Sequence, residues 1–247
     1  MNIGAQTVER LRSVIRRHGI FGTFLLVIRT INGLLRENSK ERRREWEQQL
    51  EFDKTYGVDT AIKVPSSALR PPDPRGTAAL HAVAYQPTSV EALHQILQSI
   101  PARLADFTFI DIGAGKGRAL LIASHYPFRR IIGVEFSPHL AEIAQRNIAV
   151  YQDPEQRCHA IECVCIDASQ YPLPREGNLL LYLYNPFGEP VMRAFLEVVA
   201  RGVGDREIWL VYANPVLRYL LDEVEFLSPV QNGAGLSLYR AVRSIVV

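Results

Sequence analysis

Cysteine is scarce in this sequence. Only Cys158, Cys163 and Cys165 are present, close together and beside His159. No C-x-x-C pair and no second group of ligands occurs elsewhere, so the spacing does not fit a zinc site. Cys163 and Cys165 alternate along an expected strand and would face the same side of it. We therefore predict buried thiols, no metal site, and the reducing cytoplasm as the compartment.

The sequence also lacks an apolar run long enough for a membrane helix. The stretch at residues 20–28 is shorter than the ~20 residues that such a helix needs. Charge resumes at once and no small-residue cleavage site follows, which argues against a signal peptide. Residues 7–49 are expected to form one or two helices packed on the rest of the chain or on a second copy. Peripheral contact of this basic segment with a membrane surface is the alternative.

A strong excess of charge of one sign is missing, since the formal net charge is +2. Residues 1–49 hold ten of the 28 Lys and Arg but only five of the 26 Asp and Glu, so the remainder is slightly acidic. The rest of the sequence lacks a basic stripe interleaved with aromatic residues, which is the usual footprint of a nucleic-acid surface. Nucleic acid is therefore not expected as a partner.

The length and composition fit one α/β domain with a modest appendage. Hydrophobic residues make up 47% and charged residues 22% of the 247 residues, as in ordinary globular proteins. Four prolines within residues 65–74 interrupt any helix there and indicate an extended connector that can cover an active site. We predict a helical extension at 1–50, a Pro-rich connector at 51–84 and a catalytic domain at 85–247.

From residue 85 onward, strands and helices are expected to alternate. The apolar pattern predicts strands at 107–112, 130–135, 161–166, 178–184 and 207–212. Such alternation is typical of a doubly wound parallel sheet. Residues 225–230 and 236–242, joined through Asn232-Gly233, predict a closing antiparallel hairpin. The expected fold is a Rossmann-like doubly wound sheet of about seven strands ending in that hairpin.

Two helix starts can be read from capping residues. Thr88 and Glu91 have the spacing of a capping box, in which each side chain bonds the other residue's backbone N–H. Ser137 followed by Pro138 predicts a second helix start, with serine as the N-cap and proline at the first helical position.

The segment from Asp111 to Arg118 carries the main chemical signal. Gly113 and Gly115 follow a strand and allow the backbone to approach a ligand closely. The G-x-G-x-G spacing differs from the G-x-G-x-x-G of dinucleotide sites, and Asp111 would repel a pyrophosphate but attract a cationic or amine-bearing ligand. Glu135, at the end of the second strand, can accept both ribose hydroxyls. Together these residues predict an adenosine-containing ligand with a positive charge.

Residues 85–239 resemble the class I S-adenosylmethionine (SAM)-dependent methyltransferases. The resemblance implies that Asp111, Gly113 and Gly115 line the methionine end of SAM and that Glu135 holds the ribose. It also implies that Asp167, at the end of the third strand, lies near the adenine amine, although an ordinary loop cap is the alternative for that residue.

Two short stretches are similar to the disruptor-of-telomeric-silencing type of histone lysine methyltransferase. These are Tyr85 to Thr88, where the family has Tyr-Gly-Glu-Thr, and Asn185 to Phe187, where it has Asn-Asn-Phe. The similarity implies that Tyr85 and Thr88 lie on the cofactor side. Gln86-Pro87 and Pro186 depart from the family pattern, which puts the histone substrate in doubt.

Asn185 and Phe187 are also the candidates for the acceptor side. Asn-Pro-Phe is similar to the Asn-Pro-Pro-Phe/Tyr of amino-directed DNA methyltransferases, with one proline missing. An amide oxygen and a nearby backbone carbonyl can orient an NH2 group, and an aromatic ring can favour its developing positive charge. A turn that only shapes the pocket is the alternative.

The sequence therefore predicts a SAM-dependent methyltransferase that transfers a methyl group to a nitrogen, or less readily an oxygen, of a protein or small-molecule acceptor. A SAM- or nucleotide-binding module without catalysis, tethered to a membrane or partner by the basic N-terminal helix, is the alternative. An oxidoreductase that uses NAD is disfavoured by the glycine spacing and the terminal hairpin.

Overall fold

The computed structural model describes residues 40–69, 81–233 and 235–242. The chain divides into two compact units, residues 1–48 and 49–247. The apolar stretch at residues 20–28 and the prolines at 71, 72 and 74 lie outside the described residues. In the described part, no helix is long and apolar enough to cross a membrane.

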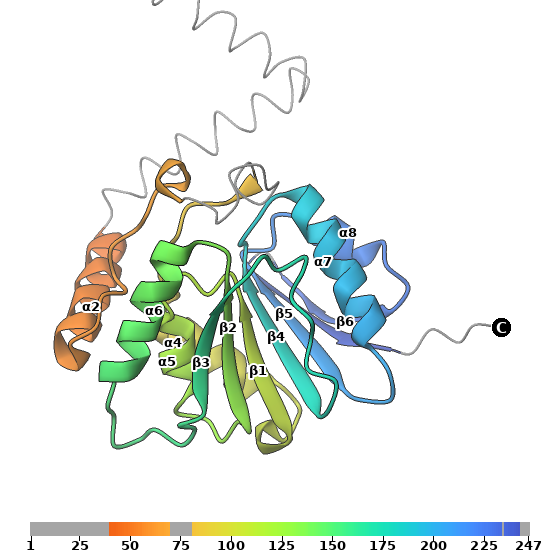
Figure 1. Cartoon of the computed structure of the whole chain (residues 1–247), viewed down its shortest axis with the longest axis horizontal. Helices are drawn as coiled ribbons and strands as arrows, with labels where there is room; N and C mark the ends of the chain where they lie inside the picture. Colours follow the sequence, from red (N-terminus) through yellow and green to blue (C-terminus); the bar gives the residue numbers. More distant parts are fainter. Residues whose placement is uncertain (1–39, 70–80, 234, 243–247) are drawn as a thin grey trace, which may run out of the picture. The chain divides into compact units, whose positions relative to one another are not determined.

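A seven-stranded sheet forms the centre of the second unit (Figure 1). Its strand order is β3-β2-β1-β4-β5-β7-β6. The first five strands run parallel and are β1 (Phe107–Ile112), β2 (Arg130–Glu135), β3 (Ile161–Cys165), β4 (Asn178–Tyr184) and β5 (Ile208–Ala213). All six residues of β1 are buried, as expected of a central parallel strand covered on both faces.

The sheet ends in the predicted antiparallel hairpin. Strand β6 (Leu227–Asn232) pairs with β7 (Leu236–Ala241), and β7 pairs with β5. The Rossmann-like sheet with a terminal hairpin, predicted from the sequence, is therefore confirmed, with strand boundaries within two residues of those expected.

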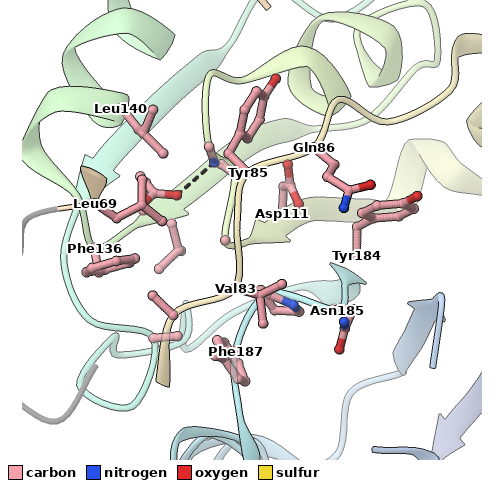
Figure 2. Close-up of a pocket in the computed structure, with 18 of the residues that line it drawn as sticks. Leu69, Val83, Tyr85, Gln86, Asp111, Phe136, Leu140, Tyr184, Asn185 and Phe187 are labelled. Carbon is pink, nitrogen blue, oxygen red and sulfur yellow. Dashed lines mark hydrogen bonds between the residues drawn. The ribbon is translucent and has the colours of Figure 1, made fainter. Parts of the chain in front are cut away.

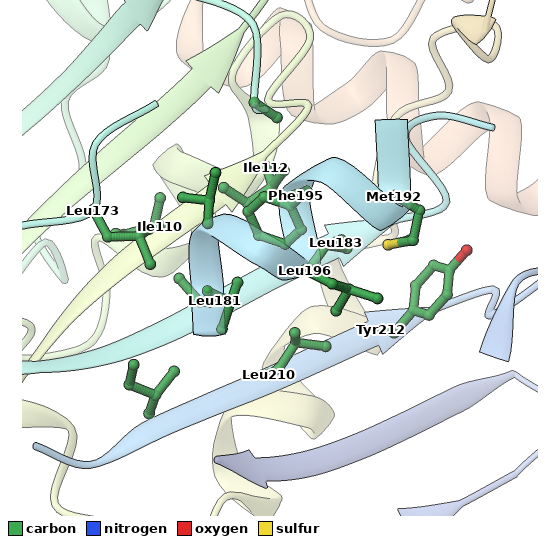
Figure 3. Close-up of a cluster of buried hydrophobic side chains, with 14 of the residues drawn as sticks. Ile110, Ile112, Leu173, Leu181, Leu183, Met192, Phe195, Leu196, Leu210 and Tyr212 are labelled. Carbon is green, nitrogen blue, oxygen red and sulfur yellow. The ribbon is translucent and has the colours of Figure 1, made fainter. Parts of the chain in front are cut away.

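Helices cover both faces of the sheet. Buried side chains of α4 (Val90–Ser99), α5 (Arg118–Ala123) and α6 (Pro138–Val150) share one core with Phe109 and Tyr182. On the other face, α7 (Glu189–Gly202) and α8 (Arg218–Asp222) share a core with Ile110 and Ile112. Phe195 and Met192 of α7 lie over this second face (Figure 3). The alternation of strand side chains thus sends neighbouring residues into different cores.

Shorter elements precede and connect these layers. Helix α2 (Lys40–Tyr56) continues past the predicted boundary at residue 50 and is followed by the 3-10 helix η1 (Ser66–Ala68). A second 3-10 helix, η2 (Leu104–Asp106), leads into β1. Two isolated antiparallel bridges, Val64 with Tyr85 and Ala82 with Phe187, fix the segment that enters α4.

Two local predictions are corrected by the structure. The N-cap of α4 is Ser89, whose hydroxyl accepts from the N–H of Ala92, because the Thr88 side chain is buried and turned toward Tyr182. Cys158 and Cys163 are buried as predicted, but Cys165 is exposed, since it ends the edge strand β3. Ser137 is the N-cap of α6, with Pro138 in its first turn, as predicted.

Candidate functional site

A pocket opens at the carboxyl ends of β1, β2 and β4. Strands β1 and β4 are neighbours although β2 and β3 come between them in the sequence, so the chain reverses its winding direction there. Such a switch point is the usual ligand site of an open α/β sheet. The pocket and the open solvent at its mouth together make up about 820 Å³ of space. Its lining includes Asp111, Gly113, Gly115, Glu135, Asp167, Tyr85, Thr88, Asn185 and Phe187, so the structure brings all the predicted site residues together.

The loop from Gly113 to Gly117, here called the glycine loop, adopts a backbone that only glycine accepts easily. The φ angles of Gly113, Gly115 and Gly117 are +82°, +55° and +84°. A Cβ atom on Gly113 would lie 2.4 Å from Cβ of Pro186. A Cβ atom on Gly115 would lie 2.2 Å from the ring of Tyr85. The loop therefore packs directly against Pro186 and Tyr85 and leaves no room for a side chain at either position.

Asp111 supplies a buried carboxyl group beneath this loop. It is 3% exposed and lines the pocket on the sheet face opposite to Ile110 and Ile112. Burial, with a smaller contribution from the charge of Glu135, raises the pKa of Asp111 to about 8. A cationic group placed beside it would favour the ionised form. The site is thus suited to a ligand that carries positive charge or donates strong hydrogen bonds.

Glu135 connects the glycine loop to the end of β2. Its Oε2 accepts from the N–H of Gly115 at 2.7 Å, and its Oε1 accepts from the N–H of Ser137 at 2.8 Å. Burial raises the pKa of Glu135 to about 7, and these backbone donors oppose that shift. Each carboxylate oxygen has a second lone pair, so the side chain can also accept from ribose hydroxyls.

Asp167 follows β3 and borders the far side of the pocket. Its Oδ1 accepts from the backbone N–H of Ser169 at 2.8 Å and from the Ser169 hydroxyl at 2.7 Å. This is the local cap that the sequence left open as an alternative. The same residue borders the pocket, so a cap and a ligand contact are compatible.

Tyr85 and Thr88 close the pocket from the segment before α4. The Tyr85 ring lies against Gly115, and its hydroxyl donates to the carbonyl oxygen of Thr60 at 2.7 Å. The hydroxyls of Thr88 and Tyr182 lie 3.5 Å apart. Figure 2 shows Tyr85 and Gln86 on the strand-like segment that crosses the pocket beside Asp111.

Asn185 and Phe187 follow the end of β4 and have different surroundings. Asn185 has a φ of +43°, and its Oδ1 accepts from the Tyr212 hydroxyl at 3.2 Å. Phe187 is 7% exposed and packs edge-on against Phe195 at 6.1 Å between ring centroids. The ring of Phe187 therefore belongs mainly to the core, although the residue borders the pocket (Figure 2).

Several residues of the site had no place in the sequence prediction. Leu69, Phe136 and Leu140 give the pocket an apolar wall. Phe136 directly follows Glu135, so proximity in sequence could have identified it. Lys116 and Arg118, the basic residues of the glycine segment, are buried and paired with Asp59 and Asp53. No local pattern indicates partners so far away in the sequence.

Comparison with known proteins supports a methyltransferase. Residues 110–178 match the methyltransferase domain family, over the segment that carries Asp111, both predicted glycines, Glu135 and Asp167. No curated protein sequence matches the chain.

Several solved structures are similar to the chain. One is an RNA methyltransferase from Salinibacter ruber in complex with S-adenosylhomocysteine, similar over 63% of this chain and 92% of that one, with 17% identity and a TM-score of 0.43. Another is a putative SAM-dependent methyltransferase from Methanococcus maripaludis, similar over 64% and 87%, with 17% identity and a TM-score of 0.46.

The sheet topology and the family match together define the fold. The chain has a Rossmann-like methyltransferase fold. The family match and the buried carboxyl group of Asp111 in the pocket support SAM as the cofactor.

Proposed function

We propose that this protein is a SAM-dependent methyltransferase whose acceptor atom is a nitrogen of a protein or small molecule. The observation that carries the proposal is the contact between the cofactor and acceptor sides of one pocket. The Cβ position of Gly113 lies 2.4 Å from Cβ of Pro186, so the glycine loop meets the Asn-Pro-Phe segment directly. A methyl donor held by the loop would face the residues that follow β4.

The cofactor side has a donor set that suits SAM. The Asp111 carboxylate would attract the amino and sulfonium groups, and Glu135 would accept from the ribose hydroxyls. Asp167 would accept from the adenine amine, and Phe136 and Leu140 offer apolar contact. SAM supplies a methyl group on a positively charged sulfur, which leaves as a neutral thioether once the methyl group is transferred.

The acceptor side centres on Asn185. The backbone N–H of Leu217 donates to the Tyr212 hydroxyl at 3.3 Å, and that hydroxyl donates to Oδ1 of Asn185. These two hydrogen bonds hold the Asn185 amide in one orientation, and its Oδ1 keeps a second lone pair that can accept from an N–H of the methyl acceptor. The carbonyl of Pro186 is also oriented, since it accepts from the N–H of Val83. A methyl acceptor whose NH2 group donates to these two oxygens would bind with its nitrogen lone pair directed into the pocket.

Positioning and desolvation are the main contributions of the protein in this proposal. A nitrogen acceptor that arrives neutral forms the new N–CH3 bond with its own lone pair and loses a proton to water afterwards. The similarity to the disruptor-of-telomeric-silencing type rests on the stretches at Tyr85 and Asn185 alone, so no histone acceptor is proposed.

Calorimetric titration with SAM, S-adenosylhomocysteine and NAD tests the cofactor. We expect binding of the first two and none of NAD. Binding of NAD without SAM would refute the proposal. The acceptor class is tested by incubating the enzyme with SAM labelled on the methyl group and a cell extract fractionated into protein, nucleic acid and small molecules. Label in the protein or small-molecule fraction is expected, and label confined to nucleic acid would contradict the proposed acceptor class.

A further inference from the structure

We propose that residues 49–64, here called the clasp, position the glycine loop for cofactor binding and that Asp53 and Asp59 are the positioning residues. This inference rests on the proposed function and adds to it a part of the chain outside the predicted catalytic domain. The clasp holds the two basic side chains of the glycine segment, Lys116 and Arg118, and the ring that covers Gly115.

Arg118 follows the glycine loop and is fixed almost entirely by the clasp. Its side chain is 1% exposed. Nη2 donates to Oδ1 of Asp53 at 2.8 Å and to the carbonyl oxygen of Gln49 at 2.8 Å. Nε donates to the hydroxyl of Thr60 at 2.6 Å, and the guanidinium lies 4.6 Å from the centre of the Phe52 ring. Among the described residues, Asp53 is the one carboxylate that pairs with Arg118.

Lys116 lies within the glycine loop and is held in the same manner. It is 4% exposed, and its Nζ donates to Oδ1 of Asp59 at 2.6 Å. Asn147 of α6 joins the two segments, since its Nδ2 lies 2.9 Å from the carbonyl oxygens of both Asp59 and Lys116. The N–H of Asp59 donates back to Oδ1 of Asn147 at 2.9 Å. Backbone and side chain of the loop are thus both connected to the clasp.

The clasp also determines where Tyr85 stands. The hydroxyl of Tyr85 donates to the carbonyl oxygen of Thr60, and its backbone pairs with that of Val64 in both directions. The ring consequently lies so close to Gly115 that a Cβ atom there would collide with it. A shift of the clasp would move this ring relative to the cofactor pocket.

Asp53 is the centre of the network. Besides Arg118, its carboxylate accepts from the N–H and hydroxyl of Thr60 and from the N–H of Ala61. Without the charge of Asp53, the buried guanidinium of Arg118 would have no counter-charge. An unpaired buried charge is strongly destabilising, so Arg118 is expected to move. Since Arg118 is directly joined to Gly117, the glycine loop would move with it.

Titration of the full-length protein with S-adenosylhomocysteine tests the clasp. We expect Asp53→Asn to weaken binding about tenfold or more, in the range typical of coupled sites, and Asp59→Ala to weaken it by a smaller factor. Hydrogen exchange of residues 113–118 should accelerate in both variants. Asp222→Asn is the matched control, because it removes the carboxylate partner of Tyr239 at 2.7 Å outside the pocket. It should lower the melting temperature and leave the affinity unchanged.

The outcomes separate the two proposals. If the wild-type protein binds neither SAM nor S-adenosylhomocysteine, the proposed function is wrong. If the wild type binds but Asp53→Asn binds equally well, or Asp222→Asn weakens binding as much as Asp53→Asn, the clasp is overturned and the proposed function stands. If Asp53→Asn fails to fold, Asp59→Ala provides the test. The Asp59 side chain is 55% exposed, so its truncation is expected to disturb folding less. Unchanged affinity and unchanged exchange in that variant would then overturn the clasp.

Discussion

The Glu135 carboxylate accepts a hydrogen bond from the backbone N–H of Gly115 at 2.7 Å, which joins the glycine loop to the tip of the neighbouring strand. In the proposed enzyme, Glu135 therefore both holds the glycine loop in place and accepts hydrogen bonds from the ribose.

Glu135→Ala should weaken binding of S-adenosylhomocysteine by about 10- to 100-fold, because hydrogen bonds to a charged group contribute about 1.5–3 kcal/mol. Glu135→Gln should have a smaller effect, since the amide oxygen can still accept from one of the two backbone donors. Calorimetry on both variants provides the measurement. Equal loss in the two would show that charge, and not loop geometry, dominates.

Gly113→Ala should abolish measurable cofactor binding. The added Cβ would meet Pro186 at 2.4 Å, and a φ of +82° is strained for alanine. Gly204→Ala is the matched control, because Gly204 also has a positive φ, +43°, but no atom lies within 4 Å of its Cβ position. Titration of both variants separates collision from backbone strain. Intact binding in Gly113→Ala would show that the close contact between the glycine loop and Pro186 is not needed for cofactor binding, and Gly113→Arg should be inactive for the same reason as Gly113→Ala.

Asn185→Ala should leave the affinity for SAM nearly unchanged and lower turnover about 100-fold, as expected when a positioning contact to the acceptor is lost. Asn214→Ala serves as the control, since Asn214 follows the neighbouring strand β5 with a φ of +49° but does not line the pocket. Turnover is measured with labelled SAM on the acceptor fraction. Weakened SAM binding in Asn185→Ala would place this residue on the cofactor side instead.

The affinity for SAM should rise with pH between about 6 and 8. Without ligand, burial raises the pKa of Asp111 to about 8, so the carboxyl carries a proton below that pH. A cationic ligand binds the ionised form, and the proton must leave on binding, at a cost of up to about tenfold in affinity per pH unit. Titrations at several pH values in buffers of different ionisation enthalpy would reveal the released proton. In Asp111→Asn, the affinity for SAM should depend less on pH, and the remaining dependence should come from the ionisable groups of SAM itself.

The raised pKa of Asp111 also predicts how the stability of the ligand-free protein depends on pH. The folded-state pKa of Asp111 lies above its unfolded value of 3.8, so its contribution to stability is fully present below pH 3.8 and is lost as the pH rises toward 8. Chemical denaturation of the wild type and of Asp111→Asn between pH 5 and 8.5 measures this contribution. The stability of the variant relative to wild type should increase with pH, and a constant difference would argue against the raised pKa.

The sequence by itself determined the sheet and the identity of the loop. Strands such as β1 and β4 are nearly continuous apolar segments with glycine or proline near their ends, a pattern typical of parallel strands buried on both faces. The positions of Gly113 and Gly115 after β1, and of Glu135 at the tip of β2, are local features of the chain. Because parallel strands end at the same edge, their convergence at one pocket was predictable as well.

Only the tertiary structure decided how those residues are held. Asp53 and Arg118 are 65 residues apart, and no spacing or pattern in the sequence connects them. The packing of Phe187 against Phe195 and the hydrogen bond from Tyr212 to Asn185 likewise depend on how α7 and β5 lie beside β4. Periodicity and turn chemistry act over a few residues and therefore appear in the sequence, whereas the partner of a buried charge is chosen by the complete packing around it.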